Sequence, residues 1–275
     1  MRSMPAGSTP WRGFAATRPL LIADPFFYAV AVPAVLIAGI SKGGFGGGVG
    51  LVAVPLMALA VSPVQAAAIM LPILVAMDAV GLWAYRGRWD RWNMAVLLPA
   101  AILGIGIGAA SFRYLDATAV RLLLGVVAVS FSLDYYVKRW RNPEAAVQGR
   151  RPPLAKAGAL GMVSGFTSFV AHAGGPPLSM VLLPQRLDTT VFVGTTVVFF
   201  AVVNFVKLFP YAWLGQFDAT NLLTSAVLLP IVPAGIYSGI WLVRRVPKGV
   251  FYNIVYALVL AIGGKLVVDG VSGLL

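Results

Sequence analysis

Long, uncharged stretches of apolar residues recur along the whole chain and restrict its fold more than any other feature. Of the 275 residues, 59% are hydrophobic and only 11% are charged, whereas about a quarter of a soluble domain is charged. So little polar surface cannot cover a globule in water, but apolar stretches of about 20 residues cross a bilayer as helices. The stretches do not alternate with period two, which excludes a transmembrane barrel. The sequence therefore predicts an all-α polytopic membrane protein.

The helices are predicted to form the same arrangement twice, namely an interrupted helical hairpin or re-entrant unit followed by three transmembrane helices. The first repeat covers 26–137, with the interrupted unit at 26–61 and helices at 64–85, 93–112 and 118–137. The second covers 156–272, with the interrupted unit at 156–184 and helices at 189–209, 219–243 and 250–271. Residues 1–25 are predicted to be a disordered tail, and 138–155 a basic cytoplasmic linker.

Residue matches between the two parts support an internal repeat. The segment 95–99, Ala-Val-Leu-Leu-Pro, recurs at 226–230. In that register the matched pairs are Gly104 with Gly235, Gly108 with Gly239, and Arg113 with Arg244. The glycine-rich breaks in the two interrupted units align as well, at a slightly different offset.

The basic residues fall mostly between the apolar stretches and set the orientation. The formal net charge is +12, and positive loops stay in the cytoplasm, so this charge indicates topology rather than nucleic-acid binding. Placing the basic loops near 86–91, 138–156 and 244–248 on one side requires each interrupted unit to enter and leave on the same side. The two halves then lie in opposite orientations with both termini periplasmic, which is the inverted-repeat architecture of many secondary transporters.

The two breaks are the predicted substrate site. Non-helical backbone inside a membrane is costly unless it lines a cavity, and helix N-termini beside such a break favour an anion. Paired breaks in two inverted halves are a sequence indicator of a transport site; close helix packing through small residues is the alternative. The predicted substrate-binding residues are Ser41, Lys42, Gly43, Gly44, Gly46, Gly47, Gly48, Ser168, His172, Gly174 and Gly175.

Three ionisable residues inside the predicted membrane segments have two interpretations each. Lys42 either pairs with the anion or extends its ammonium to the interface. His172, which aligns with Phe45 of the first half, either binds the anion and relays a proton or packs as a neutral ring. Asp78 is a candidate for proton coupling, together with His172, or else forms a structural ion pair.

Other polar residues in the spans are assigned structural roles. Lys207 lies late in its predicted helix and fits a lysine that reaches the interface. Asp134 and Lys265 lie near helix ends at equivalent repeat positions. Ser164 and Thr167 flank the second break, where they either donate to the substrate or satisfy backbone carbonyls.

No cofactor is predicted. The chain has no cysteine and one histidine, so neither a thiolate site nor a multi-histidine metal site is possible. It contains no nucleophile–base–acid grouping and no nucleotide-binding loop, so an enzyme is not expected. The predicted partners are a small anion and the lipid bilayer, with no nucleic acid, and the oligomeric state is left open.

The segment 39–55, Gly-Ile-Ser-Lys-Gly-Gly-Phe-Gly-Gly-Gly followed by apolar residues and a proline, resembles the TauE/SafE sulfite exporter family. The second copy at 161–183 and the duplicated layout over 26–271 share the resemblance. The resemblance implies secondary transport of sulfite, sulfonates or related sulfur-containing anions in the bacterial inner membrane. The function expected is therefore a small-anion carrier working by alternating access, with a proton as the candidate coupling ion. The alternatives are a passive anion channel and a non-transporting scaffold or lipid-binding subunit.

Overall fold

The computed structural model describes residues 21–46, 53–111, 117–141 and 149–273, and all regular structure within them is helical, as predicted. Among these residues, six candidate membrane spans are long and apolar enough to cross a bilayer. They are α1 (Pro25–Gly44), α3 (Pro63–Ala84), α4 (Arg91–Ser111), α8 (Thr189–Trp213), α9 (Ala219–Leu228) continued by α10 (Ile231–Val243), and α11 (Lys248–Ser272). The remaining elements are α2 (Ala53–Met57), α5 (Ala117–Arg141), α6 (Leu154–Ala171), α7 (Gly175–Leu182) and the 3₁₀ turn η2 (Leu183–Gln185).

Short polar side chains start four of these helices where the apolar stretches begin. Each accepts a hydrogen bond from a backbone N–H in the first turn, which satisfies a donor that has no partner within the helix. These N-cap residues are Asp24 of α1, Ser62 of α3, Asp188 of α8 and Asp218 of α9. In α1 and α3 the cap is followed directly by a proline, whose fixed φ suits the first helical position.

The predicted helix 219–243 is instead two helices, α9 and α10, which meet at Leu229 and Pro230. Proline has no N–H for the helical ladder and its ring clashes with the preceding turn. Pro230 and Pro233 remove two donors within four residues here. The equivalent α4 contains Pro99 alone and continues without interruption.

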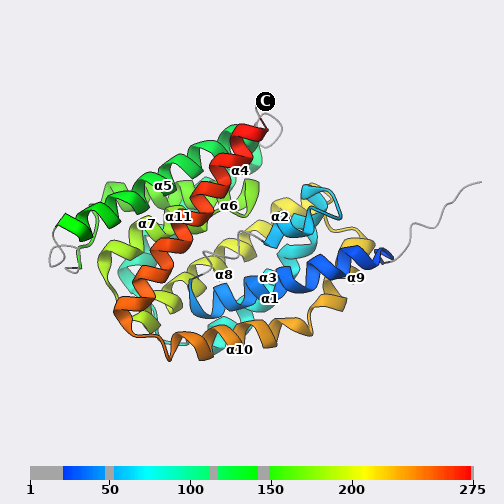
Figure 1. The fold of residues 1–275 in the computed structure, drawn as a ribbon. Helices are drawn as coiled ribbons and strands as arrows, with labels where there is room; N and C mark the ends of the chain where they lie inside the picture. Colours follow the sequence, from blue (N-terminus) through cyan, green and yellow to red (C-terminus); the bar gives the residue numbers. More distant parts are fainter. Residues whose placement is uncertain (1–20, 47–52, 112–116, 142–148, 274–275) are drawn as a thin grey trace, which may run out of the picture.

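Glycines bring two pairs of helices into backbone contact. Gly39 of α1 faces Gly235 of α10, where a Cβ on Gly39 would lie 2.8 Å from the Cα of Gly235. On Gly104 of α4, a Cβ would lie 2.0 Å from the carbonyl oxygen of Met162 in α6. Contacts further along each pair advance in the same direction, so α1 runs parallel to α10 and α6 runs parallel to α4. Figure 1 shows α1 in blue beside α10 in orange.

Corresponding helices of the two halves make corresponding contacts. The fourth helix of each half packs on the first helix of the other, as α10 does on α1 and α4 on α6. The last helices, α5 and α11, pack on each other and lie side by side in Figure 1. The third helices, α3 and α8, also contact each other. This exchange pattern is what a duplicated chain produces when equivalent surfaces meet.

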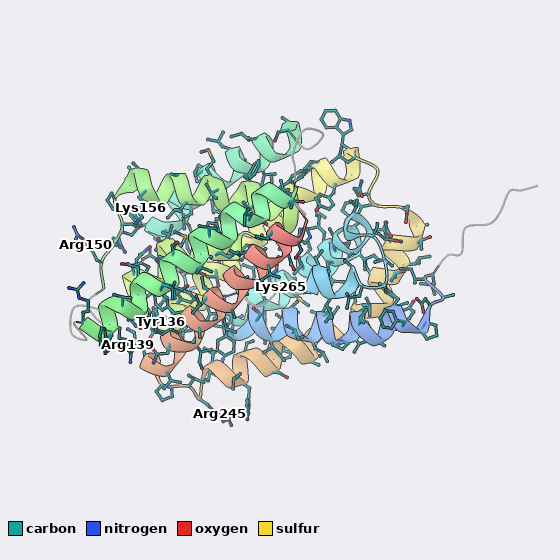
Figure 2. All side chains as sticks on the ribbon, turned by 45° about the horizontal axis from the view of Figure 1, so that its top comes forward. Tyr136, Arg139, Arg150, Lys156, Arg245 and Lys265 are labelled. Carbon is teal, nitrogen blue, oxygen red and sulfur yellow. The ribbon has the colours of Figure 1, made fainter. Side chains whose placement is uncertain are left out.

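Basic residues gather at one end of the bundle. Figure 2 shows Arg139, Arg150 and Lys156 at the left end in that view. The end of the predicted basic linker is tied to the α3–α4 loop by an ion pair of 2.9 Å between Arg151 and Asp90. Two of the loops that were predicted to share one side of the membrane are therefore in contact.

Candidate functional site

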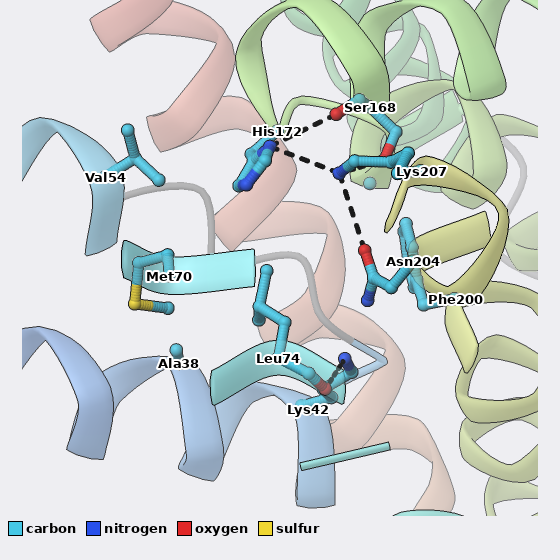
Figure 3. A pocket seen from close by; sticks show the side chains of 11 residues that line it. Ala38, Lys42, Val54, Met70, Leu74, Ser168, His172, Phe200, Asn204 and Lys207 are labelled. Atoms are coloured by element: carbon cyan, nitrogen blue, oxygen red, sulfur yellow. Dashed lines mark hydrogen bonds between the residues drawn. The ribbon is translucent and has the colours of Figure 1, made fainter. Parts of the chain in front are cut away.

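A cavity of about 50 Å³ lies at the centre of the bundle, where α1 and α3 of the first half meet α6 and α8 of the second (Figure 3). The lining side chains come from both interrupted units and from both third helices. They are Ala38, Lys42, Val54, Met70, Leu74, Ser168, His172, Gly175, Phe200, Asn204 and Lys207. Most of this wall is apolar, so the few polar groups determine what the cavity binds.

Lys207 of α8 is fully buried, with 0% of its surface exposed. The prediction that it reaches the membrane interface is therefore wrong. Its ammonium lies 3.4 Å from Ser168 Oγ, 3.2 Å from His172 Nδ1 and 3.5 Å from Asn204 Oδ1, as the dashed lines of Figure 3 mark. No carboxylate of the described residues lies within 4 Å of it.

Lys42 of α1 also lines the cavity, but its charge is already paired. Its Nζ lies 2.6 Å from Asp78 Oδ1, an oxygen with no other partner in the described structure. The same ammonium donates to the Leu74 carbonyl at 3.1 Å. Both side chains are at least 94% buried, so the pair satisfies two charges that the apolar interior would otherwise reject.

Asn204 joins the ion pair to Lys207 and so links the two halves. Its Nδ2 donates to Asp78 Oδ2 at 2.8 Å, while its Oδ1 faces Lys207. Asp78 and Asn204 occupy the same position in their helices, each sixteen residues after the N-cap, which is Ser62 in α3 and Asp188 in α8. The two equivalent residues therefore meet where α3 and α8 cross.

His172 ends α6 in a left-handed conformation, with φ of 52°. Its Nδ1 lies between the Lys207 ammonium at 3.2 Å and the Ser168 carbonyl at 3.2 Å. The ammonium requires an unprotonated Nδ1 and the carbonyl requires a protonated one, so neither tautomer satisfies both. The Ala67 backbone also interacts with the ring, but no hydrogen bond of acceptable geometry reaches the buried Nε2.

Hydroxyl groups of α6 hold the second break in shape. Ser164 Oγ donates to the Gly174 carbonyl at 2.7 Å, and Thr167 Oγ1 lies 3.1 Å from the Ala173 carbonyl. These side chains replace the helical bonds that the break removes, which is the structural role considered for them. Ser168, one residue further on, faces the cavity instead.

The glycines of the first break have a packing role where they are described. A Cβ on Gly43 would lie 2.3 Å from the Ile236 carbonyl oxygen, and one on Gly44 would lie 2.6 Å from that of Gly239. Both glycines therefore face α10, and neither lines the cavity. Gly46 has φ of 68°, which favours glycine at this turn.

The other residues predicted to bind substrate also differ in whether they line the cavity. Gly175 lines the cavity, whereas a Cβ on Gly174 would meet the Ser164 carbonyl oxygen at 2.8 Å. Ser41 is buried on α1 and is not part of the cavity wall. The predicted residues Gly47 and Gly48 lie outside the described residues.

The N-terminus of α7 supplies fewer donors than the glycine pattern suggested. Pro176 and Pro177 follow Gly175 directly and have no N–H. The Leu178 N–H bonds to the Gly174 carbonyl at 3.3 Å. Side chains, rather than a row of backbone amides, therefore provide most of the polar groups of this cavity.

Charge at the site does not balance among the described groups. Two buried lysines face one buried carboxylate, and that carboxylate pairs with Lys42. A charge inside a membrane protein is costly unless it is paired. A small anion in the cavity would supply the missing partner of Lys207.

Comparison with known proteins fits this geometry. The family model described as "Sulfite exporter TauE/SafE" matches residues 31–266. The chain belongs to the TauE/SafE family. A relative in Cupriavidus necator, named "Probable sulfite/organosulfonate exporter TauE", is 24% identical over 183 residues. That match spans 64% of this chain and 66% of the relative, just under two thirds of its length. No solved structure matches the chain.

The matching family is one of exporters rather than enzymes, and with six candidate spans among its described residues this chain is a multi-pass protein of the bacterial inner membrane. Lys207 was not predicted to line the candidate site, and Asn204 was given no role. A signal for Asn204 was present, because Asp78 and Asn204 lie at matching distances from their helix starts.

Proposed function

We propose that this protein carries a small sulfur oxyanion, with sulfite as the first candidate and organosulfonates as the second. The anion would lie against the Lys207 ammonium, with the Ser168 hydroxyl and the His172 ring beside it. The observation that carries the proposal is the complete burial of Lys207 next to a cavity, with no described carboxylate within 4 Å. An ammonium in this position attracts an anion strongly, because the surrounding interior screens charge poorly.

The volume of the cavity favours a compact substrate. About 50 Å³ holds roughly three to five water-sized groups, since each needs about 10–15 Å³. Sulfite, a sulfur atom with three oxygens, is of that size. A longer organosulfonate would require the surrounding helices to separate, so we expect sulfite to bind more tightly.

We further propose that transport occurs by alternating access between two inverted halves. The parallel pairs α1·α10 and α6·α4, each held by glycine contacts, support units that move as rigid bodies. The cavity lies between these pairs and is lined from both halves. His172 is the proposed proton carrier, because its Nδ1 lies between the Lys207 ammonium and the Ser168 carbonyl. Asp78 would keep the Lys42 charge compensated during the cycle.

The test is uptake of radiolabelled sulfite into proteoliposomes, with and without a pH gradient, for the native protein and the Lys207→Gln variant. A hydrogen bond to a charged group contributes about 1.5–3 kcal/mol, so the variant should bind sulfite about ten- to a hundredfold more weakly. Lys265→Gln is the matched control, because this lysine of the same half pairs with Asp269 on the exposed surface. Its uptake should equal that of the native protein.

Three outcomes would contradict parts of the proposal. Normal sulfite uptake by a folded Lys207→Gln protein would remove the anion site. Flux that does not saturate and ignores the pH gradient would replace the carrier by a passive channel. Absence of flux for sulfite and for every sulfonate tested, from folded native protein, would favour a scaffold.

A further inference from the structure

A second cavity, of about 380 Å³, opens between the end of α3 and α10 and shares no lining residue with the central one. Its volume falls within the range of about 300–1,000 Å³ that is usual for small-molecule sites. Aromatic, aliphatic and basic side chains form its wall: Trp83, Ala84, Arg86, Tyr237, Ile240 and Arg244. The transport mechanism proposed above uses none of them.

Two arginines give this cavity a positive rim. Arg86 follows the end of α3, and Arg244 is the C-cap residue of α10. Neither belongs to an ion pair formed within the described residues. Guanidinium groups bind phosphate through two parallel N–H bonds, so a pair converging on one cavity suits a phosphate group.

The rest of the wall is apolar or aromatic, and its two aromatic side chains face outward. Trp83 is 62% exposed and Tyr237 is 49% exposed, although both lie in helices that cross the membrane. The Arg86 guanidinium lies 5.8 Å from the Trp83 ring centroid, over its face. Tryptophan and tyrosine are enriched at the headgroup level of a bilayer, where the apolar and polar parts of their side chains are both accommodated.

We propose that this cavity, hereafter the α3–α10 cavity, binds the headgroup of an anionic phospholipid. Arg86 and Arg244 would hold the phosphate, while Trp83 and Tyr237 contact the glycerol and the upper acyl chains. Both arginines lie in loops that the positive-inside rule places on the cytoplasmic side, where the leaflet surface is negative. A lipid fits better than a free phosphate because an inorganic ion would leave the exposed rings of Trp83 and Tyr237 in the wall uncovered.

The bound lipid would join the ends of α3 and α10, which both contact the last turn of α1. Tyr85, directly before Arg86, donates its hydroxyl hydrogen to the Gly43 carbonyl of α1. Gly43 adjoins Lys42 in the sequence and packs against α10. A lipid in the α3–α10 cavity would thus hold the ends of α3 and α10 around the last turn of α1.

The test measures phosphatidylglycerol binding to the detergent-purified full chain by native mass spectrometry, with phosphatidylcholine of the same acyl chains as reference. An arginine near an anionic lipid contributes about fivefold in affinity. The double variant Arg86→Gln/Arg244→Gln should therefore lose about thirtyfold in preference for phosphatidylglycerol. Arg88→Gln/Arg245→Gln is the matched control, because it removes the same charge from the same two loops and neither residue lines the cavity. This control should keep the preference.

Other results would overturn the proposal. Equal losses in both double variants would indicate diffuse surface charge, and no loss in either would exclude the arginines. Glycerophosphate binding as tightly as the lipid would indicate a free-anion site. If the Arg86→Gln/Arg244→Gln protein does not fold, the test uses Trp83→Ala, which keeps both charges. That variant should weaken phosphatidylglycerol binding at least threefold, and unchanged binding would refute the lipid site.

Discussion

The residues that cap the helices before the two breaks align with each other in the sequence but make different contacts. Phe45 caps the C-terminus of α1 and His172 caps that of α6. Phe45 stacks on Phe251 of α11, with ring centroids 6.0 Å apart and planes 8° from parallel. His172 instead faces the Lys207 ammonium at 3.2 Å. One half uses this position to pack against an apolar neighbour, whereas the other uses it to line the cavity.

The third helices of the two halves, α3 and α8, also carry different side chains at matching positions. Asp78 of α3 is matched by Asn204 of α8, and Gly81 is matched by Lys207, each counted from its own N-cap. Gly81 allows Val197 to approach, since a Cβ there would lie 2.9 Å from Val197 Cγ1. The helix contacts of the two halves thus follow a similar pattern, and a few unequal side chains make the centre positive.

The largest expected effect comes from removing the carboxylate of the first half. Asp78→Ala should lower the free energy of unfolding by about 3–5 kcal/mol, because it leaves Lys42 buried without a partner. The exposed Asp269→Ala control should change stability by less than about 1 kcal/mol. Unfolding in detergent, followed by circular dichroism, measures both. The double variant Lys42→Met/Asp78→Leu should restore stability, and failure to do so would show that the ion pair is not the cause.

The next largest effect is expected from glycines at the helix contacts, and it tests whether the two halves pack alike. Gly43→Ala places a Cβ 2.3 Å from a backbone oxygen of α10, and Gly165→Ala places one 2.0 Å from the Ala101 oxygen of α4. Each should destabilise the protein by about 1–3 kcal/mol through overpacking. Gly106→Ala, where a Cβ meets open space, should be neutral or stabilise by up to about 1 kcal/mol. A tolerated change in only one half would break the equivalence of the two helix pairs.

Exchanging Asp78 and Asn204, which lie at matching positions in α3 and α8, tests whether an unpaired Lys207 holds the anion. The double variant Asp78→Asn/Asn204→Asp keeps the net charge but moves the carboxylate toward Lys207, which lies 3.5 Å from Asn204 Oδ1. Lys207 would then have an internal partner, so sulfite uptake in proteoliposomes should fall about tenfold or more. Native uptake by this variant would mean that a free Lys207 charge is not what holds the anion.

The smallest effect concerns the C-cap of α6. His172→Asn keeps a residue that tolerates the left-handed conformation, so stability should change by less than about 1 kcal/mol. The lost ring interaction is of ordinary hydrogen-bond strength, so sulfite uptake should fall about two- to tenfold. The remaining uptake should no longer respond to a pH gradient, because asparagine cannot carry the proton. Thermal unfolding and uptake are measured on the same preparation. A fall in stability without any change in uptake would assign His172 to packing.

The helices could be predicted from the sequence because hydropathy and capping act over short distances along the chain. The apolar stretches and the N-caps Ser62 and Asp188 place α3 and α8 within a few residues of their predicted bounds. The break between α9 and α10 was missed, because the effect of Pro230 depends on the second proline three residues later. Proline also stands inside α1, α3, α4 and α8 without dividing them.

The candidate site was predictable only in part. Lys42, His172, Ser168 and Gly175 do meet at one cavity, since residues beside paired breaks converge when the halves pack together. Gly43 was assigned to the substrate because a glycine that admits a ligand and one that admits another helix look the same in sequence.

The sequence by itself determined that this chain is an all-helical, multi-pass membrane protein of the TauE/SafE family. Those features follow from composition, periodicity and motifs, which are local properties. Only the tertiary structure decided which charges are paired. Lys42 has a carboxylate because α3 brings Asp78 to 2.6 Å from it, whereas α8 buries Lys207 among a hydroxyl, an imidazole and an amide. The environment of a side chain inside a membrane depends on the helices around it, and their arrangement is a property of the whole fold.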